Sequence, residues 1–419
     1  MGKHILFISY DGMTDPLGQS QVIPYLAGLC KFGYTFTILS CDKQDRYARD
    51  KDYVLNMLAG LPITWVSIPY HKKPPVLSSW YDYRMLRKTA VSLHARTPFD
   101  LVHTRVGIPA LVGYWLKNHL GIKFLNDIRG FWADERVDGG MWNIKNPVYK
   151  LVYKFFKRKE DQFITTADAN TCLTFAARNE IHKWSAIPKQ PIPIEVIPCC
   201  ADMDLFDPNN IDLRTQEQFR TELGIEPGDL VISYLGSIGG WYLTDEMMRF
   251  CKLLGDQLPA AKFLFISPHL HDVIEAAAAK HGLSANKLVV KHGKRHEVPA
   301  LLSLSQFSIF FIKSCYSKIS SSPTKHGEIM AMGIPVITNS GVGDVAQIVR
   351  RFKAGYVVSD FSEQAFAKVV DEIKAGIQFD AASIRKGAGE FYSLDNAVRG
   401  YCKVYEEIFA TKKLAVPVL

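Results

Sequence analysis

The chain alternates short apolar stretches with helical patterns, and this alternation runs through it twice. The first run holds strand-like segments at residues 4–9, 35–40, 63–69, 101–104, 123–127, 169–173 and 194–198. After a polar stretch at 202–212, the second run holds strand-like segments at residues 230–235, 262–266, 287–291, 308–312 and 335–338. Strands that alternate with helices form βαβ units around parallel sheets. The sequence therefore predicts two successive doubly wound α/β domains, residues 1–200 and 201–393.

A long helical pattern closes the chain at residues 394–411, where Tyr401, Tyr405 and Phe409 are spaced by four. Residues at this spacing share one face of a helix, and an aromatic face of this kind predicts packing against a core. We expect the helix to cross back, so that residues 394–419 pack on the first domain.

Neither a membrane span nor a leader is expected. The longest apolar stretch, residues 301–312, is shorter than the roughly 20 residues that a membrane helix needs. The apolar run near the N-terminus ends at Asp11 and is too short for a secretory signal. The eight cysteines include no CxxC pair, which favours reduced thiols. These features predict a cytoplasmic protein.

The positive charge is confined to the first half of the chain. Residues 1–200 hold 26 Lys and Arg against 17 Asp and Glu, whereas residues 201–419 hold 24 against 25. A one-sided basic surface indicates an anionic partner, which could be nucleic acid, a membrane surface or a phosphorylated substrate. Residues 150–159 concentrate five cations among aromatic and aliphatic residues at helical spacing. Such a helix could lie on an anionic membrane, or pack on a core with its charged face solvated. No nucleic-acid motif accompanies it, so we expect no nucleic-acid partner.

One segment, from Ser322 to Ile337, is the densest in residues suited to chemistry. Ser322 is a good N-cap and Pro323 a good first helical residue, so a helix should begin there and offer free N–H groups to a phosphate. Lys325 adds a cation, and Glu328, on the same face, could accept hydrogen bonds from paired sugar hydroxyls. Gly327 costs a helix about 1 kcal/mol unless close approach is needed. The alternative is an ordinary capped helix with a solvated Lys–Glu pair.

This segment resembles the nucleotide-sugar site of retaining glycosyltransferases of the GT-B fold, family 4 or group 1. In that family an SPTK-like turn precedes a helix with a Glu and then an AMGxPVI strand. Further resemblance lies in DPLGQSQVIPYL at 15–26, DIRGFWADERVDGG at 127–140, ADANTCLT at 167–174, VIPCCADMDLF at 196–206 and YLGSIGGWY at 234–242. These motifs occur in the family's order, and the resemblance implies two Rossmann-like domains that face a cleft.

The resemblance also implies roles for individual residues. Glu328 would hold the donor ribose and Lys325 the diphosphate, while Gly18, Gln19 and Ser20 would form a loop facing donor and acceptor. Acceptor-side or transition-state contacts would come from strand ends. The implied catalytic residues are His103, Asp127, Arg129, Lys325 and Glu328. The implied donor-binding residues are Gly18, Gln19, Gly236, Ser237, Gly239, Ser322, Thr324, Gly341 and Gly343.

The sequence departs from the family pattern in two places. Ser320 stands where many members carry a second Glu that contacts the sugar, and Trp241 with Tyr242 stands where many carry an Arg and a Lys. Lys325, with Lys318 as a second possibility, would then supply the positive charge for the diphosphate.

Several of these residues also have simpler interpretations. His103 could be a structural histidine, and Asp127 with Arg129 could be a salt bridge that fixes a loop. Residues 341–346 fit the dinucleotide fingerprint G-x-G-x-x-A, but they follow a late strand rather than the first strand of their domain.

The resemblance implies a retaining enzyme of hexosyltransferase type that moves a sugar from a nucleotide diphospho-sugar to a glycan hydroxyl. We expect a lipid-linked acceptor, a role in cell-surface polysaccharide or glycoconjugate synthesis, and peripheral association with the inner face of the cell membrane. Neither a metal nor a cofactor is implied. A sugar-nucleotide epimerase, a non-catalytic GT-B relative that binds nucleotide or glycan, and a nicotinamide oxidoreductase remain as alternatives.

Overall fold

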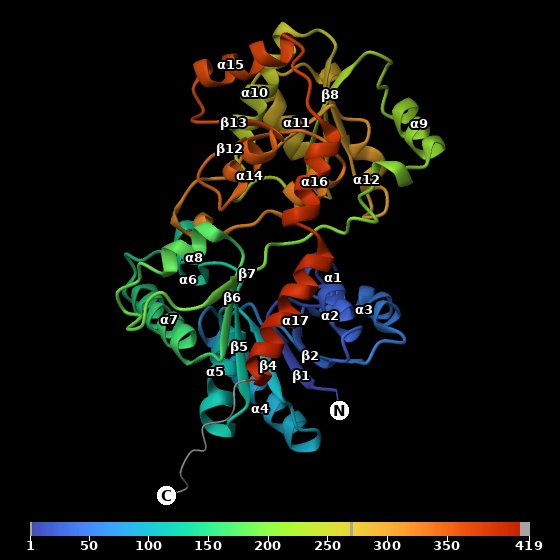
Figure 1. The fold of residues 1–419 in the computed structure, drawn as a ribbon. Helices are drawn as coiled ribbons and strands as arrows, with labels where there is room; N and C mark the ends of the chain where they lie inside the picture. Colours follow the sequence, from blue (N-terminus) through green and yellow to red (C-terminus); the bar gives the residue numbers. More distant parts are fainter. Residues whose placement is uncertain (1, 269–270, 411–419) are drawn as a thin grey trace, which may run out of the picture. The chain divides into compact units, whose positions relative to one another are not determined.

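The computed structural model describes residues 2–268 and 271–410, which form two compact units (Figure 1). The first unit runs to Pro198 and resumes at Leu394, and the second comprises Cys199–Ser393. The predicted boundary at 200/201 thus lies two residues from the observed one. Residues 411–419, which the predicted first domain includes, lie outside the described residues.

The first unit is built on a seven-stranded sheet in the order β3-β2-β1-β4-β5-β6-β7, with every pair parallel. Its strands are β1 His4–Ser9, β2 Thr35–Asp42, β3 Ile63–Pro69, β4 Leu101–Arg105, β5 Lys123–Ile128, β6 Ala169–Cys172 and β7 Ile194–Val196. Strand β2 is buried along almost its whole length, as expected of a parallel strand covered on both faces.

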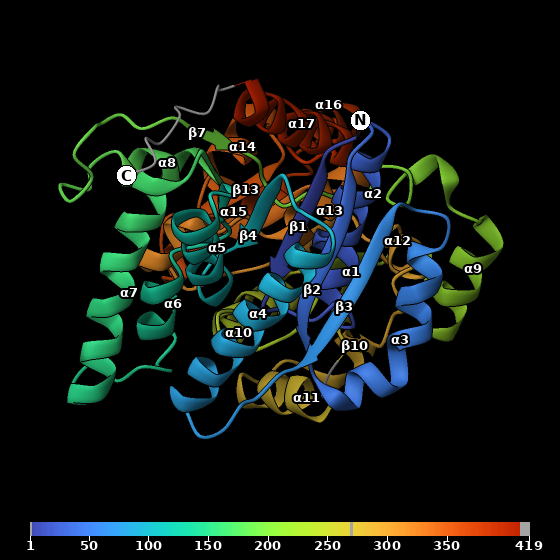
Figure 2. The same ribbon diagram turned by 90° about the horizontal axis from the view of Figure 1, so that it is seen from below.

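Two layers of helices cover this sheet (Figure 2). Helix α2 packs against α3 and α17, and α5 packs against α4 and α7. The helices of the unit are α1 Pro16–Gln21, α2 Ile23–Cys30, α3 Gln44–Leu58, α4 Leu77–Arg96, α5 Ile108–Leu120, α6 Trp132–Asp138, α7 Pro147–Thr166, α8 Phe175–Ile181 and α17 Leu394–Ala410. The C-terminal helix therefore belongs to the first unit, and Tyr401 and Tyr405 on its aromatic face are buried there.

The second unit repeats the architecture with six parallel strands in the order β10-β9-β8-β11-β12-β13. Its strands are β8 Leu230–Leu235, β9 Ala261–Ile266, β10 Leu288–Lys291, β11 Phe307–Ile309, β12 Val336–Asn339 and β13 Gly355–Val358. Its α-helices are α9 Leu213–Glu222, α10 Thr244–Gln257, α11 His271–Lys280, α12 Val298–Leu302, α13 Thr324–Ala331, α14 Val345–Phe352, α15 Glu363–Lys374 and α16 Ala381–Phe391.

The predicted α/β class is confirmed, but the element pattern missed some members. Strand β13 has only four residues, begins at Gly355 and is half-buried, so its apolar run is short. Helix α3 is mainly polar, with only Val54 and Leu58 buried. Each of the cysteines is a free thiol. Within residues 2–268 and 271–410, no helix is both long enough and apolar enough to cross a membrane.

Candidate functional site

The second unit gathers its predicted donor residues at one edge of its sheet. Strand order reverses between β8 and β11, and ligands of open α/β sheets bind beyond the carboxyl ends of the strands at such a switch point. Gly236 follows β8, Lys318 lies beyond β11, and Gly341 follows β12. Backbone contacts join these loops, because Gly343 N donates to the Lys318 carbonyl at 2.9 Å.

Gly236 and Lys325, which lie far apart in the sequence, meet directly. Gly236 has φ +111°, and a Cβ atom placed on it would lie 2.9 Å from Lys325 Nζ. Both the backbone angle and the approach of the ammonium group therefore favour glycine at this position. The glycine turn and the first turn of α13 thus form one local site.

Lys325 is buried against two aromatic rings. Its Nζ donates to Tyr234 Oη at 3.2 Å and lies 4.3 Å from the Tyr234 ring centroid and 3.8 Å from that of Tyr242. Burial lowers the pKa of Lys325 to about 7, against the opposing effect of the nearby Glu328 charge. The ammonium form is therefore poorly compensated, and a bound anion would stabilise it.

A second lysine is held in the same way. Lys318 belongs to the short 3-10 turn Tyr316–Ser320, and its Nζ lies 3.7 Å from the ring centroid of Trp241. Trp241 and Tyr242 stand where the family pattern has cations, and each ring contacts a lysine from another segment. Ser320, in place of the second Glu, donates its hydroxyl to the Ser317 carbonyl at 2.7 Å.

Glu328 lies one turn beyond Lys325 on α13 and is buried. Its Oε1 accepts a hydrogen bond at 2.9 Å from Nη1 of Arg295, a residue in the loop after β10. No local motif indicates Arg295, because its pairing with Glu328 depends on two segments that meet only in the fold.

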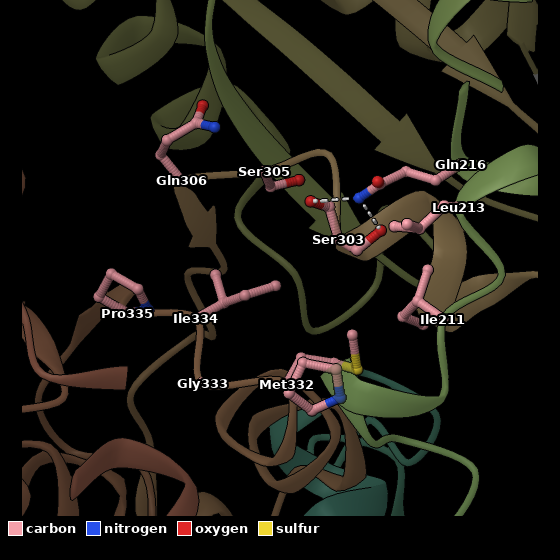
Figure 3. A pocket seen from close by; sticks show the side chains of 11 residues that line it. Ile211, Leu213, Gln216, Ser303, Ser305, Gln306, Met332, Gly333, Ile334 and Pro335 are labelled. Carbon is pink, nitrogen blue, oxygen red and sulfur yellow. Dashed lines mark hydrogen bonds between the residues drawn. The ribbon is translucent and has the colours of Figure 1, made fainter. Parts of the chain in front are cut away.

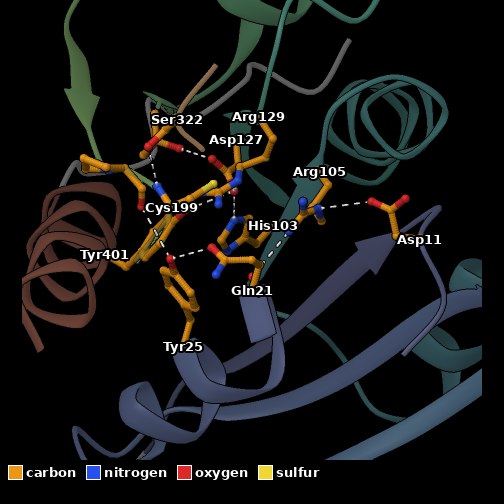
Figure 4. Close-up of polar contacts among 12 residues, drawn as sticks. Asp11, Gln21, Tyr25, His103, Arg105, Asp127, Arg129, Cys199, Ser322 and Tyr401 are labelled. Carbon is orange, nitrogen blue, oxygen red and sulfur yellow. Dashed lines mark hydrogen bonds and ion pairs between the residues drawn. The ribbon is translucent and has the colours of Figure 1, made fainter. Parts of the chain in front are cut away.

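The helix start predicted at Pro323 is wrong by one residue. Helix α13 begins at Thr324, its N-cap is Pro323, and no side chain caps it. The predicted cap, Ser322, instead accepts a hydrogen bond from Cys199 N at 3.2 Å (Figure 4). The hydroxyl that was expected to cap the helix therefore anchors the segment that enters the unit.

Gly327 has a packing role rather than a ligand role. A Cβ atom here would lie 2.9 Å from the Cβ and Cγ atoms of Tyr392. The hydroxyl group of Tyr392 shares a 2.8 Å hydrogen bond with His326 Nδ1. The backbone carbonyl of Tyr392 accepts a hydrogen bond from Ala201 N at 2.8 Å. The close approach that would justify a glycine here is therefore made by the side chain of Tyr392.

The remaining glycines of the predicted donor set lie at the same edge. Gly239 N donates to Thr244 Oγ1 at 3.2 Å, and the Ser237 carbonyl accepts from the Tyr234 hydroxyl. At Gly341, φ is +84° and a Cβ atom would lie 2.0 Å from Ser314 Oγ. The G-x-G-x-x-A match is therefore a tight loop between β12 and α14, far along the chain from β8, the first strand of this unit.

In the first unit, His103, Asp127 and Arg129 form a buried cluster (Figure 4). His103 Nε2 lies 3.5 Å from Asp127 Oδ2, and Arg129 Nε lies 3.9 Å from the same oxygen. His103 is the third of the five residues of β4, so its predicted place at a strand end is wrong. Asp127 is near the end of β5, and Arg129 follows that strand.

The C-terminal helix completes this cluster. The Tyr405 hydroxyl shares a 2.7 Å hydrogen bond with His103 Nδ1, and the Tyr401 hydroxyl donates to Asp127 Oδ2 at 3.0 Å. Burial lowers the pKa of His103. Burial would raise the pKa of Asp127, but the charge of Arg129 and the hydrogen bond from His103 hold it well below its usual value. The cluster is a neutral imidazole beside a compensated ion pair.

Gly18, Gln19 and Ser20 do not form a loop, contrary to the prediction. They lie in α1, which begins at Pro16. A Cβ atom on Gly18 would lie 2.4 Å from the Gly12 carbonyl oxygen, so this glycine lets α1 pack on the turn after β1.

Another polar group at the carboxyl ends of the first sheet was not predicted. Asp82 is buried on α4, and its Oδ1 lies 2.6 Å from His71 Nδ1. Its Oδ2 accepts a hydrogen bond from the Tyr10 hydroxyl at 2.7 Å. His71 follows β3 and Tyr10 follows β1. The acid is 72 residues from Tyr10 in sequence, so no local motif reveals the group.

A separate pocket of about 330 Å³ lies at the opposite edge of the second sheet (Figure 3). Ser305 and Gln306 precede β11, and Gly333 to Pro335 precede β12, so the pocket is at the amino ends of these strands. None of the predicted site residues lines it. Among residues 2–268 and 271–410, no group of three His, Cys, Asp or Glu side chains is placed to hold a metal ion.

Two α/β units with all-parallel sheets are the fold of the GT-B glycosyltransferases, as predicted. The solved structure of a glycosyltransferase from Rickettsia africae superposes with a TM-score of 0.73 over 98% of this chain and 100% of that one, at 16% identity. The Anabaena protein Alr3699/HepE, solved in complex with UDP, gives a TM-score of 0.70 over 96% of this chain and 99% of that one, at 12% identity.

The sequence comparisons agree with the resemblance to group 1 glycosyltransferases. Residues 215–386 match the family model described as glycosyl transferases group 1. The D-inositol 3-phosphate glycosyltransferase of Segniliparus rotundus is 23% identical over 145 residues, which is 35% of this chain and 29% of that protein. The matched region thus spans less than a third of this curated relative. The family model covers Lys325 and Glu328 together with the glycine turn.

Proposed function

We propose that this protein is a retaining glycosyltransferase of hexosyltransferase type that takes a sugar from a nucleotide diphospho-sugar. The observation that carries the proposal is the meeting of Lys325 with the Gly236 turn, one helical turn from Glu328. This arrangement offers a cation for a diphosphate and a carboxylate for a ribose. The relative solved with UDP supports a nucleotide donor.

The same groups account for catalysis of donor cleavage. Negative charge develops on the diphosphate as the bond to the sugar breaks, and cations already in place stabilise that charge. Lys325 lies at the glycine turn, and Lys318 reaches the same edge of the sheet along the face of Trp241. The departing diphosphate takes the proton of the acceptor hydroxyl, so retention of configuration requires no protein base. The proposal invokes no metal or cofactor.

We propose a lipid-linked glycan as acceptor, which gives the enzyme a role in cell-surface polysaccharide or glycoconjugate synthesis at the inner face of the membrane. Helix α7 supports this. Its inner face buries Phe156, while Val148, Leu151 and Phe155 are 55%, 69% and 45% exposed. Spacings of three and four residues place these three on one helix face, the arrangement of helices that lie in a membrane interface.

Cations complete the outer surface of α7. Lys150, Lys154 and Arg158 are exposed and follow each other at intervals of four residues. Lys157, by contrast, points inward and pairs with Asp134 and Glu160, each at 2.8 Å. The outward cations therefore remain available to anionic headgroups, and each would contribute about 1 kcal/mol to the free energy of membrane binding.

A nucleotide screen tests the donor site. Thermal shift and calorimetry with UDP, GDP and dTDP, each free and as its glucose or mannose conjugate, should find a binder that loses affinity in Lys325→Met. Release of nucleoside diphosphate in the presence of a lipid-phosphate glycan would support transfer, and free sugar released without acceptor would support the epimerase. Absence of binding by every nucleotide would contradict the proposal.

Vesicle flotation tests the membrane surface. The wild type should bind vesicles of phosphatidylcholine with 30% phosphatidylglycerol, and added salt should weaken the binding because it screens the lysines. The Leu151→Ser/Phe155→Ser variant should lose most of it. Leu213→Ser is the matched control, since Leu213 is a 73% exposed leucine of the second unit. Equal binding by both variants would contradict the role of α7.

A further inference from the structure

The ion pair between Arg295 and Glu328 leaves one carboxylate oxygen for another partner. Arg295 Nη1 donates to Glu328 Oε1 at 2.9 Å. The carboxylate side chain is only 8% exposed, whereas the arginine side chain is 46% exposed. Arg295 thus reaches from the protein surface to a buried acid, and the pair fixes the orientation of that acid.

Arg295 is itself held in place on two sides. The centre of its guanidinium group lies 5.4 Å from the ring centroid of Phe206, which is fully buried. Its loop is closed by Glu297, whose Oε2 accepts from Lys294 N at 2.7 Å and whose N–H donates to the Lys294 carbonyl at 2.8 Å. A planar guanidinium fixed in this way loses little freedom when it binds a carboxylate.

The competing partner for Glu328 is Lys325. The two residues are three apart on α13, and their charges interact, since Glu328 raises the pKa of the lysine against the larger effect of burial. A carboxylate turned toward Lys325 would point away from the position assigned to the ribose hydroxyls. Arg295 holds the carboxylate by Oε1 and so fixes its orientation against this competing contact.

We propose that Arg295 is a positioning residue of the donor site, which holds Glu328 toward the ribose hydroxyls and makes the site select ribonucleoside over 2′-deoxyribonucleoside diphosphates. The inference rests on the proposed function, because it assigns the ribose to Glu328. It adds a specificity that the proposed function does not contain, discrimination at the sugar of the nucleotide. It also separates two parts of the ligand, since Arg295 acts on ribose binding and Lys325 on diphosphate binding.

Calorimetry on the full chain tests this separation. The probes are UDP and GDP, each beside its 2′-deoxy counterpart, and inorganic pyrophosphate, which has no ribose. The wild type should prefer the ribonucleotide by about tenfold, the effect of one hydrogen bond to a charged group. Arg295→Gln should weaken ribonucleotide binding about tenfold and bring the two forms to near equality, with pyrophosphate binding unchanged. Arg295→Lys should give an intermediate affinity for the ribonucleotide, because lysine keeps the positive charge but lacks the planar guanidinium group and its fixed N–H donors.

Two controls exclude a general effect of charge or stability. Arg351→Gln removes an exposed arginine of the same unit that pairs with Glu390, and it should leave all affinities unchanged. In a Glu328→Gln background, Arg295→Gln should have no further effect on the preference for ribose, because the two residues act as one unit.

Other results would overturn the inference. If Arg295→Gln keeps the wild-type preference for ribose, or weakens pyrophosphate and ribonucleotide equally, Arg295 acts as a general cation and not through Glu328. A wild type that binds none of the nucleotides would instead contradict the proposed function. The two failures are therefore distinct.

Discussion

The two units hold buried charge in opposite ways. In the first unit, Asp127 has Arg129, His103 and Tyr401 around it, so the charge is compensated within the protein. In the second unit, Lys325 lies against tyrosine rings, and its pKa is lowered because compensation is incomplete. Removal of one partner from a compensated cluster leaves an unpaired buried charge and costs stability, whereas an uncompensated cation already costs stability and is stabilised by a bound anion. The comparison predicts that mutations affect folding in one unit and activity in the other.

Asp127→Ala should have the largest effect, on stability. It leaves a buried arginine and histidine without their acid, and breaking a buried pair in this way costs about 3–5 kcal/mol. Chemical denaturation measures the loss. Asp11→Ala is the control, since Asp11 is half-exposed and pairs with Arg105 at 3.7 Å. Equal losses in the two variants would show that the buried cluster is not special.

Lys325→Met should have the next largest effect, on turnover. Removal of one preorganised group that stabilises developing negative charge costs about 10²–10³ in rate. Stability should stay the same or rise, because a buried cation is removed. Steady-state kinetics and thermal unfolding test both points, and Lys252→Met, which removes an exposed lysine paired with Asp256, is the matched control. If Lys325→Met lost stability but kept normal turnover, the lysine would serve folding and not activity, which would contradict the comparison.

The pH dependence of nucleotide binding should follow Lys325. Its pKa is lowered to about 7, and a bound diphosphate favours the ammonium form, so binding above pH 7 must take up a proton. Affinity should then fall by up to about tenfold per pH unit, or about 1.4 kcal/mol. Stability of the free protein should rise between pH 7 and the ordinary lysine pKa, because the folded state sheds this proton before the unfolded state does.

Calorimetry in buffers of different ionisation enthalpy measures this proton uptake. Lys325→Met should abolish the proton uptake by the protein, so that only the protonation change of the nucleotide itself remains. Proton uptake of the same size in the variant would assign the pH dependence to another group.

Tyr405→Phe should have the smallest effect. It removes the hydroxyl that shares a 2.7 Å hydrogen bond with His103 Nδ1, at a cost of about 1 kcal/mol. Denaturant unfolding should detect this loss, and nucleotide binding to the second unit should not change. A change in nucleotide affinity would show that the two clusters are energetically linked.

The architecture was predictable because periodicity repeats over many residues. The exceptions are elements with weak patterns, such as the half-buried edge strand that begins at Gly355. Lys325 and Glu328 were found because a local motif carries them. The surroundings of these two residues could not be predicted, because Arg295, Trp241 and Tyr242 come from other segments of the chain. No spacing within one segment encodes such contacts.

Two local details depend on partners that are distant in sequence. The predicted helix cap at Ser322 is wrong, because its hydroxyl accepts from Cys199 N, a partner 123 residues away. The close approach that Gly327 indicates is present, and the near neighbour is the side chain of Tyr392. In both cases a contact distant in sequence replaced the local explanation.

These two contacts have a mechanical consequence. The chain enters the second unit at Cys199 and leaves it at Ser393, and both ends are attached to the start of α13, through Ser322 and through Tyr392 with His326. We therefore expect tension along either peptide connection to reach the segment that carries Lys325, because both ends of the unit are hydrogen-bonded to that segment.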